Sequence, residues 1–91
     1  MARCPLELLD DLDGLLAQVR AWEGVTEKGP AVFYLRRQPF LHFHLVEGNR
    51  RRADVKTATG WTQLEVPRPI SAARRRTLLN ALRREHAARA R

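Results

Sequence analysis

Between residues 31 and 66, apolar and polar side chains alternate along four consecutive segments, and this pattern limits the possible folds more than any other feature of the chain. Alternation with a period of two is typical of β-strands that bury one face. Residues that favour turns, including Pro39 and Gly60, separate the segments. The pattern predicts four antiparallel strands in a meander, at residues 31–36, 40–47, 51–58 and 61–66.

A helical pattern lies on either side of these strands. In residues 5–22, apolar side chains recur every three or four positions, as in a helix with one buried face. Ser71 is a suitable N-cap for a second helix over residues 71–88, in which the leucines and His86 line one side. The intervening stretch, residues 23–30, is predicted to be a loop.

These elements predict one α+β domain over residues 1–91. Because two helices can cover only one side of a four-stranded sheet, both are expected on the same face, with the other face open. The chain is 44% hydrophobic and 30% charged, which is ordinary for a globular protein. The acidic N-terminus does not resemble a signal peptide, and Cys4 is the only cysteine, so we expect a cytoplasmic protein in which Cys4 is an incidental terminal thiol.

The register of the strands follows from keeping apolar residues on one face. A three-residue loop over residues 48–50 is expected to pair Phe43 with Val55 and His44 with Asp54. A Thr59-Gly60 turn is expected to pair Asp54 with Glu65. A loop over residues 37–39 is expected to pair Tyr34 with His42.

The open face is therefore expected to carry aromatic and titratable side chains. Its predicted members are Tyr34, Arg36, Phe40, His42, His44, Arg52, Asp54, Lys56, Trp61 and Glu65. The His42 and His44 imidazoles, with the carboxylates of Asp54 and Glu65, have the ligand types of a divalent-metal site. The simpler interpretation is an ordinary cross-strand contact between His44 and Asp54, so no metal or cofactor is predicted.

Two further uses of the open face follow from the same residues. Aromatic rings next to basic side chains are typical of surfaces on which unpaired bases stack. Exposed aromatic clusters are equally typical of contacts between proteins, including homodimer interfaces.

The charge of the chain is concentrated after residue 66. Residues 1–66 contain nine basic and nine acidic side chains, whereas the remainder has eight arginines and one acid, Glu85, which accounts for the net charge of +7. Such a patch attracts phosphates. The predicted nucleic-acid contacts are Arg68, Arg74, Arg75, Arg76, Arg83 and Arg84. The alternative is compositional bias, because only Lys28 and Lys56 among the 17 basic residues are lysines.

Catalytic motifs are absent from the sequence. It has no glycine-rich phosphate loop and no G-x-S-x-G nucleophile motif. His86 is expected to pack at the inner side or edge of the second helix. We therefore predict that the protein is not an enzyme.

The run AWEGVTEKGPAVFYLRRQPFLHFH, over residues 21–44, resembles the segment of YjbR/MmcQ-like small bacterial proteins in which a first helix leads into the first hairpin. The resemblance rests on Trp22, Gly24, Val25 and the hairpin, and departs from the family at Glu23 and at residues 36–39. It implies a double-wing-like DNA-binding fold and no assigned activity.

Taken together, these features of the sequence predict a non-catalytic binding module. Its partner is nucleic acid, or alternatively a protein or a second copy of the chain, and no membrane is involved.

Overall fold

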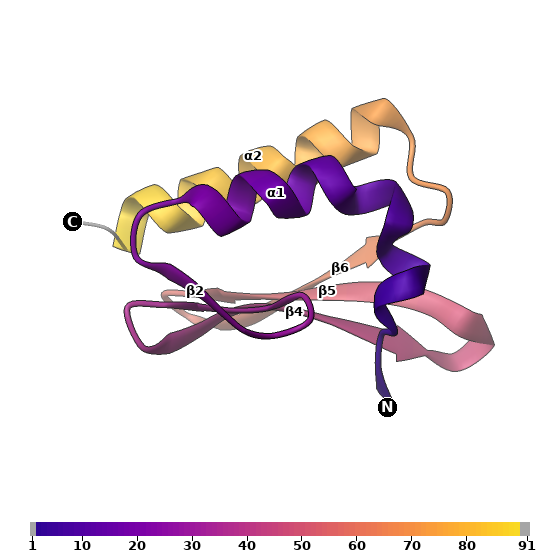
Figure 1. The fold of residues 1–91 in the computed structure, drawn as a ribbon, viewed down its shortest axis with the longest axis horizontal. Coiled ribbons are helices and arrows are strands. Elements are labelled where there is room, and N and C mark those ends of the chain that lie inside the picture. Colours follow the sequence, from indigo (N-terminus) through magenta and orange to yellow (C-terminus); the bar gives the residue numbers. More distant parts are fainter. Residues whose placement is uncertain (1, 90–91) are drawn as a thin grey trace.

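The computed structural model describes residues 2–89 as two layers, a sheet and two helices that pack against one of its faces (Figure 1). The elements are β1 (Ala2–Arg3), the 3-10 segment η1 (Leu6–Leu12), α1 (Asp13–Ala21), β2 (Val25–Gly29), β3 (Val32–Leu35), β4 (Gln38–Val46), the 3-10 turn η2 (Glu47–Asn49), β5 (Arg50–Thr57), β6 (Gly60–Val66) and α2 (Ala72–Arg89). The helices lie side by side and run in the same direction (Figure 1). The predicted α+β class, with both helices on one face, is confirmed. No helix in the described part is long and apolar enough to cross a membrane.

The main sheet has five antiparallel strands in the order β2-β3-β4-β5-β6, one more than predicted, and the two-residue β1 also pairs with β4. The additional strand is β2, which lies in the predicted loop over residues 23–30. It contains one apolar residue, Val25, so it lacks the buried set of side chains that identified the other strands. Glu27 fixes it instead, because its carboxylate accepts hydrogen bonds from the Arg20 guanidinium at 2.7 Å and from the Ala31 N–H at 2.8 Å.

The last two hairpins keep the predicted faces but differ in register from the prediction. The β4–β5 loop is Glu47–Asn49, one residue earlier than expected, with Gly48 and Asn49 at φ of 78° and 57°. Moving a turn by one residue moves the pairing by two, which preserves the face of every side chain. His42 therefore faces Asp54, and His44 faces Arg52. The β5–β6 turn is likewise one residue earlier, so Glu65 also faces Arg52.

The β3–β4 hairpin contains the one change of face. Its turn is Arg36-Arg37, both at positive φ, and β4 contains one extra residue, Phe40, between the partners of Tyr34 and Phe33. An extra residue of this kind bends the strand and redirects a side chain. Phe40 is fully buried, so its predicted place on the open face is wrong.

The first helical region is less regular than predicted. Residues 6–12 form 3-10 turns interrupted at Leu9, and only Asp13–Ala21 is α-helical. The second helix matches its prediction, since the Ser71 hydroxyl accepts the N–H of Arg74 at 3.1 Å as an N-cap. Cys4 lies beneath this region and is 3% exposed, with its N–H bonded to the Phe43 carbonyl. The prediction of an incidental terminal thiol was therefore wrong, because β1 pairs with β4 and draws Cys4 into the core.

Arg51 is the largest fully buried side chain. Its guanidinium donates to both carboxylate oxygens of Asp11, at 2.6 and 2.9 Å. It also donates to the backbone carbonyls of Leu8, Val66 and Pro67. Five bonds match the five donors of a guanidinium. Since Asp11 also accepts the Ile70 N–H at 2.8 Å, one arginine on β5 joins η1 to the segment that leads into α2.

Candidate functional site

The face of the sheet opposite the helices carries an interconnected group of polar and aromatic side chains, which we call the open face. The imidazole of His42 lies 4.9 Å from the Trp61 ring and 5.8 Å from the His44 ring, measured between centroids. The ammonium group of Lys56 is 5.5 Å from the centre of Trp61. The Trp61 side chain therefore reaches from the edge strand β6 across β5 to β4.

The carboxylate of Asp54 is already engaged by its neighbours on this face. It accepts two hydrogen bonds from the Arg52 guanidinium, at 2.7 and 3.0 Å, and lies 3.4 Å from His44 Nε2. The simple contact between His44 and Asp54 is thus present, although the two residues are not cross-strand partners. Asp54 is only 9% exposed, and this arrangement compensates its charge.

Three of the four residues considered as metal ligands, His42, His44 and Asp54, lie close together, whereas Glu65 does not join them. Glu65 faces Arg52 across the sheet, and the Asp54 carboxylate is held by the same arginine. Within residues 2–89, no group of three or more histidine, cysteine or acidic side chains has the arrangement needed to hold a metal ion. Arg52 therefore occupies the Asp54 carboxylate that a metal ion beside these imidazoles would need.

The surroundings of His42 change the pKa of its imidazole. Burial lowers the pKa of His42 below its usual value of 6.5, and the nearby His44 and Arg3 lower it further against the opposing effect of Asp54. Its Nε2, like Nδ1 of His44, is buried and has no hydrogen-bond partner in the described part of the chain. A neutral imidazole without a partner is less costly to bury there than a charged one.

We expect the stability of the fold to decrease on acidification because of His42. Its pKa is lower in the folded protein than in the unfolded chain, so the unfolded chain binds the proton first. The contribution of the neutral His42 imidazole to the free energy of unfolding is fully present above about pH 6.5. It is lost as the pH falls through the pKa of His42 in the folded protein. An NMR titration of the imidazoles should give His42 a midpoint below 6.5. A midpoint at or above that value would contradict the burial of this ring.

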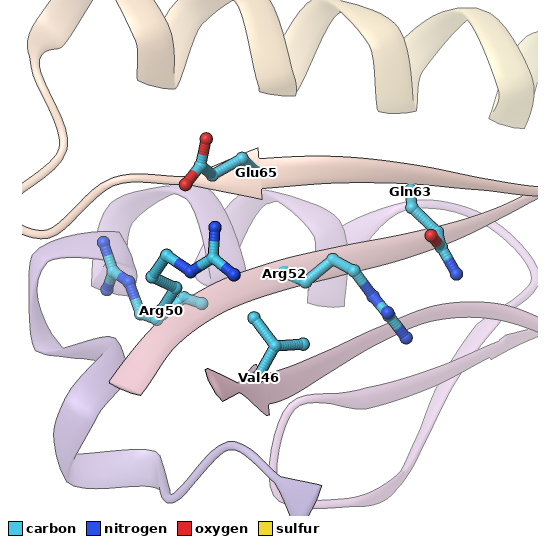
Figure 2. Close-up of a pocket in the computed structure, with 6 residues that line it drawn as sticks. Val46, Arg50, Arg52, Gln63 and Glu65 are labelled. Carbon is cyan, nitrogen blue, oxygen red and sulfur yellow. The ribbon is translucent and has the colours of Figure 1, made fainter. Parts of the chain in front are cut away.

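A shallow depression lies on the open face beyond His44, between the ends of β4, β5 and β6. Figure 2 shows Val46, Arg50, Arg52, Gln63 and Glu65 around it. Both signs of charge line it, and its arginines are engaged: Arg52 with Asp54, and Arg50 with the Glu47 carbonyl at 3.0 Å. Its volume is about 320 Å³. The depression therefore has no single charge that would select a ligand.

The predicted nucleic-acid residues lie in and just before α2, and most of them face solvent. Arg68 is within 3.4 Å of Asp10, and Arg83 donates to the side-chain oxygen of Gln18 at 2.8 Å. Across the described residues, no ion pair involves the α2 arginines Arg74, Arg75, Arg76, Arg83 and Arg84. Arg91 lies outside that part of the chain.

The arginines of α2 fall on two flanks of the helix. Arg75 and Arg76 line a hollow against α1. Arg74 and Arg84 line hollows against β6, on the opposite side of the helix. Arg89 is used structurally, because it lies 5.9 Å from the centre of the Phe40 ring and donates to the carbonyls of Pro39 and Lys56.

The remaining reactive side chains are in structural positions. His86 lies within hydrogen-bond distance of the Glu23 carbonyl, at 2.8 Å, and packs 5.2 Å from Trp22, as expected for a residue at the helix edge. Burial raises the pKa of the Cys4 thiol, which keeps it protonated and unreactive. Arg51 is the residue that the sequence analysis missed, although its position two residues before Ala53 places it on the buried face of β5.

No family model matches the chain, and no curated protein or solved structure was found to be similar to it. The resemblance to YjbR/MmcQ-like proteins therefore stays a prediction. Any functional conclusion depends on the residues themselves.

Proposed function

We propose that this protein is a non-catalytic binding module that contacts the phosphate backbone of nucleic acid through the arginines of α2. The observation that carries the proposal is the gathering on one helix of five arginines, Arg74, Arg75, Arg76, Arg83 and Arg84, without a carboxylate partner in the described part of the chain. Arg20, Arg51 and Arg52 are each paired with a carboxylate at 2.7 Å or less. The exposed arginines of α2 have no such partner within residues 2–89.

Guanidinium groups without a carboxylate partner are well suited to binding phosphate. Their planar donors bind phosphate oxygens in pairs, and they release counterions from the nucleic acid when they bind. Ten residues separate Arg74 from Arg84, or about 15 Å along the helix axis, which is the length of roughly four base pairs. Several phosphates are therefore within reach of one helix.

The open face supports binding less directly. Trp61 is 43% exposed, but its ring already contacts His42 and lies below the Lys56 ammonium. A stacked base or a second protein would have to displace these contacts. The two tryptophans can locate the ligand, because Trp22 packs against α2 and Trp61 lies on the open face.

We expect a fluorescently labelled 20-base-pair duplex to bind with an affinity that falls steeply as salt is raised. Replacing both Arg76 and Arg83 with glutamine should weaken binding at low salt by about tenfold or more, since each loses a charge-assisted contact. It should also make the slope of log K against log salt shallower by about 1.8, or 0.9 for each lost phosphate contact. Fluorescence anisotropy measures both quantities.

The matched control is a variant with Arg37 and Arg50 replaced by glutamine. Both arginines are also exposed: Arg37 lies in the β3–β4 turn, and Arg50 is the first residue of β5. Their replacement removes the same net charge. An equal loss of affinity in both variants would show that only net charge matters, and the proposal would be wrong. The two single-tryptophan variants show where the duplex binds. If the duplex changes the fluorescence of Trp61 in the Trp22→Phe variant but not that of Trp22 in the Trp61→Phe variant, the ligand lies on the open face instead.

A further inference from the structure

The two edges of the sheet differ in how they are protected against pairing with another strand. An unpaired edge can recruit a strand from another chain, and proteins usually prevent this with short strands, bulges and lysine. The β2 edge has all three features: five residues, an irregularity between Glu27 and Gly29, and Lys28. The β6 edge has seven residues, Gly60–Val66, with no proline, no lysine and an unbroken register against β5.

A groove runs between the β6 edge and α2. Two adjoining hollows, of about 320 and 200 Å³, share Leu64, Ala81 and Arg84 in their walls. The apolar residues of the groove are Val66, Ile70 and Leu78 at one end and Val55 at the other, with threonines and charged residues between and around them. An added strand next to β6 would direct every second side chain into this groove.

Charged residues of both signs line the groove. Arg74 lines one hollow, and Arg84 lines both. Glu65 also lines the first hollow, but alternation along β6 directs its side chain to the open face, opposite Leu64 and Val66. Arg74 and Arg84 are about 15 Å apart along the helix. In an added strand, residues four apart are separated by about 13 Å and face the same way, with one more residue between them on that face. Acidic residues at positions i and i+4 therefore match the two arginines, and an apolar residue at i+2 matches the leucines.

We propose that the β6 edge and this groove bind an extended acidic segment of a partner protein, which adds to the sheet as a further strand. The main-chain hydrogen bonds of such a strand supply affinity, and the side chains in the groove supply specificity. Glu85 lines the groove next to Arg84, at the end near Thr57. Glu85 sets the end of the site, because it would repel an acidic residue of the bound segment that lay beyond Arg84.

A second copy of the chain fits this edge less well. Two-fold pairing of β6 with itself would bring the α2 helices of the two copies onto the same side of the extended sheet. Arg74 of each copy would then face Arg84 of the other, and juxtaposed like charges oppose association. The proposal does not depend on nucleic-acid binding, since it needs only the β6 flank of α2.

The probe is a seven-residue peptide with glutamate at its second and sixth positions, valine at its fourth and threonine elsewhere. We expect it to shift the amide NMR signals of β6 and of the α2 residues that face β6. Replacing both Arg74 and Arg84 with glutamine should weaken binding about tenfold. The Arg76 and Arg83 variant used with DNA should bind the peptide normally, so the two proposals can fail separately.

Two matched peptides test how the segment binds. Moving the glutamates to the third and fifth positions keeps the composition but directs both charges away from the groove, so binding should be lost. Methylating the backbone nitrogens of one alternate set of residues should abolish binding, while methylating the other set should not, because only one edge of the added strand pairs with β6. The proposal would be overturned if methylating either set of backbone nitrogens weakened peptide binding equally. It would also be overturned if a peptide with lysine in place of glutamate bound equally well. Sedimentation showing that the protein alone dimerises through β6 would also overturn it.

Discussion

Replacing Arg51 with methionine is expected to lower the free energy of unfolding by about 3–5 kcal/mol, as when one partner of a buried ion pair is removed. Methionine fits a similar space but donates no hydrogen bond. The variant therefore leaves the Asp11 carboxylate and three backbone carbonyls without the donor that satisfies them. Urea denaturation at neutral pH measures the loss directly.

The matched control is Arg36→Met. Arg36 also forms an ion pair, with Glu23 at 3.5 Å, but both side chains are at least half exposed. Such pairs contribute about 0–1 kcal/mol, so this variant should be close to the unmodified protein. If the two methionine variants lost similar stability, the buried network around Arg51 would not hold the fold together.

Asp11 provides an independent measurement on the same network. The hydrogen bond from Arg51 holds the pKa of Asp11 below its usual 3.8. On acidification, Asp11 therefore takes up its proton in the unfolded chain before it does so in the folded protein. The stability that the Asp11 carboxylate contributes above about pH 3.8 is lost as the pH falls through its pKa in the folded protein. Arg51→Met should remove this part of the acid sensitivity.

Alternation along the strands predicted which side chains face the helices, but not which residues pair. Face and register depend on different information, because a shift of two residues leaves every face unchanged. The register depends on where each turn begins. Asn49 adopts the left-handed region at φ of 57°, which let the β4–β5 loop close one residue earlier than expected. The change of register placed Glu65 opposite Arg52 instead of Asp54, so the four residues considered as metal ligands do not form one group.

Charge was harder to interpret than hydrophobicity. The run Arg50-Arg51-Arg52 is uniform in the sequence, yet its three members have different environments: exposed, buried in a network and paired with Asp54. Period-two alternation alone places Arg51 with Ala53 and Val55 on the buried face. Its partner Asp11, 40 residues away, is brought near it only by the fold. The sequence could place the arginines of α2 on a solvent-facing helix, but not divide them between two flanks.

Phe40 is where the alternation gives the wrong face, and it leads to the second large effect. Phe40→Ala is expected to lower the free energy of unfolding by about 3–5 kcal/mol, the cost of removing a fully buried phenylalanine. The ring is 0% exposed and lies under the guanidinium of Arg89. Chemical denaturation measures the loss, and Phe40→Leu should cost less because it keeps most of the buried volume.

Tyr34→Ala is the control for this prediction, because Tyr34 is an aromatic residue on the open face and is only partly buried. It should cost about 1 kcal/mol, as is common for partly buried positions. Equal losses for the two variants would mean that Phe40 faces outward after all and that β4 has no extra residue. A large difference would show that a single inserted residue, which regular alternation cannot reveal, moves an aromatic ring from the open face into the core.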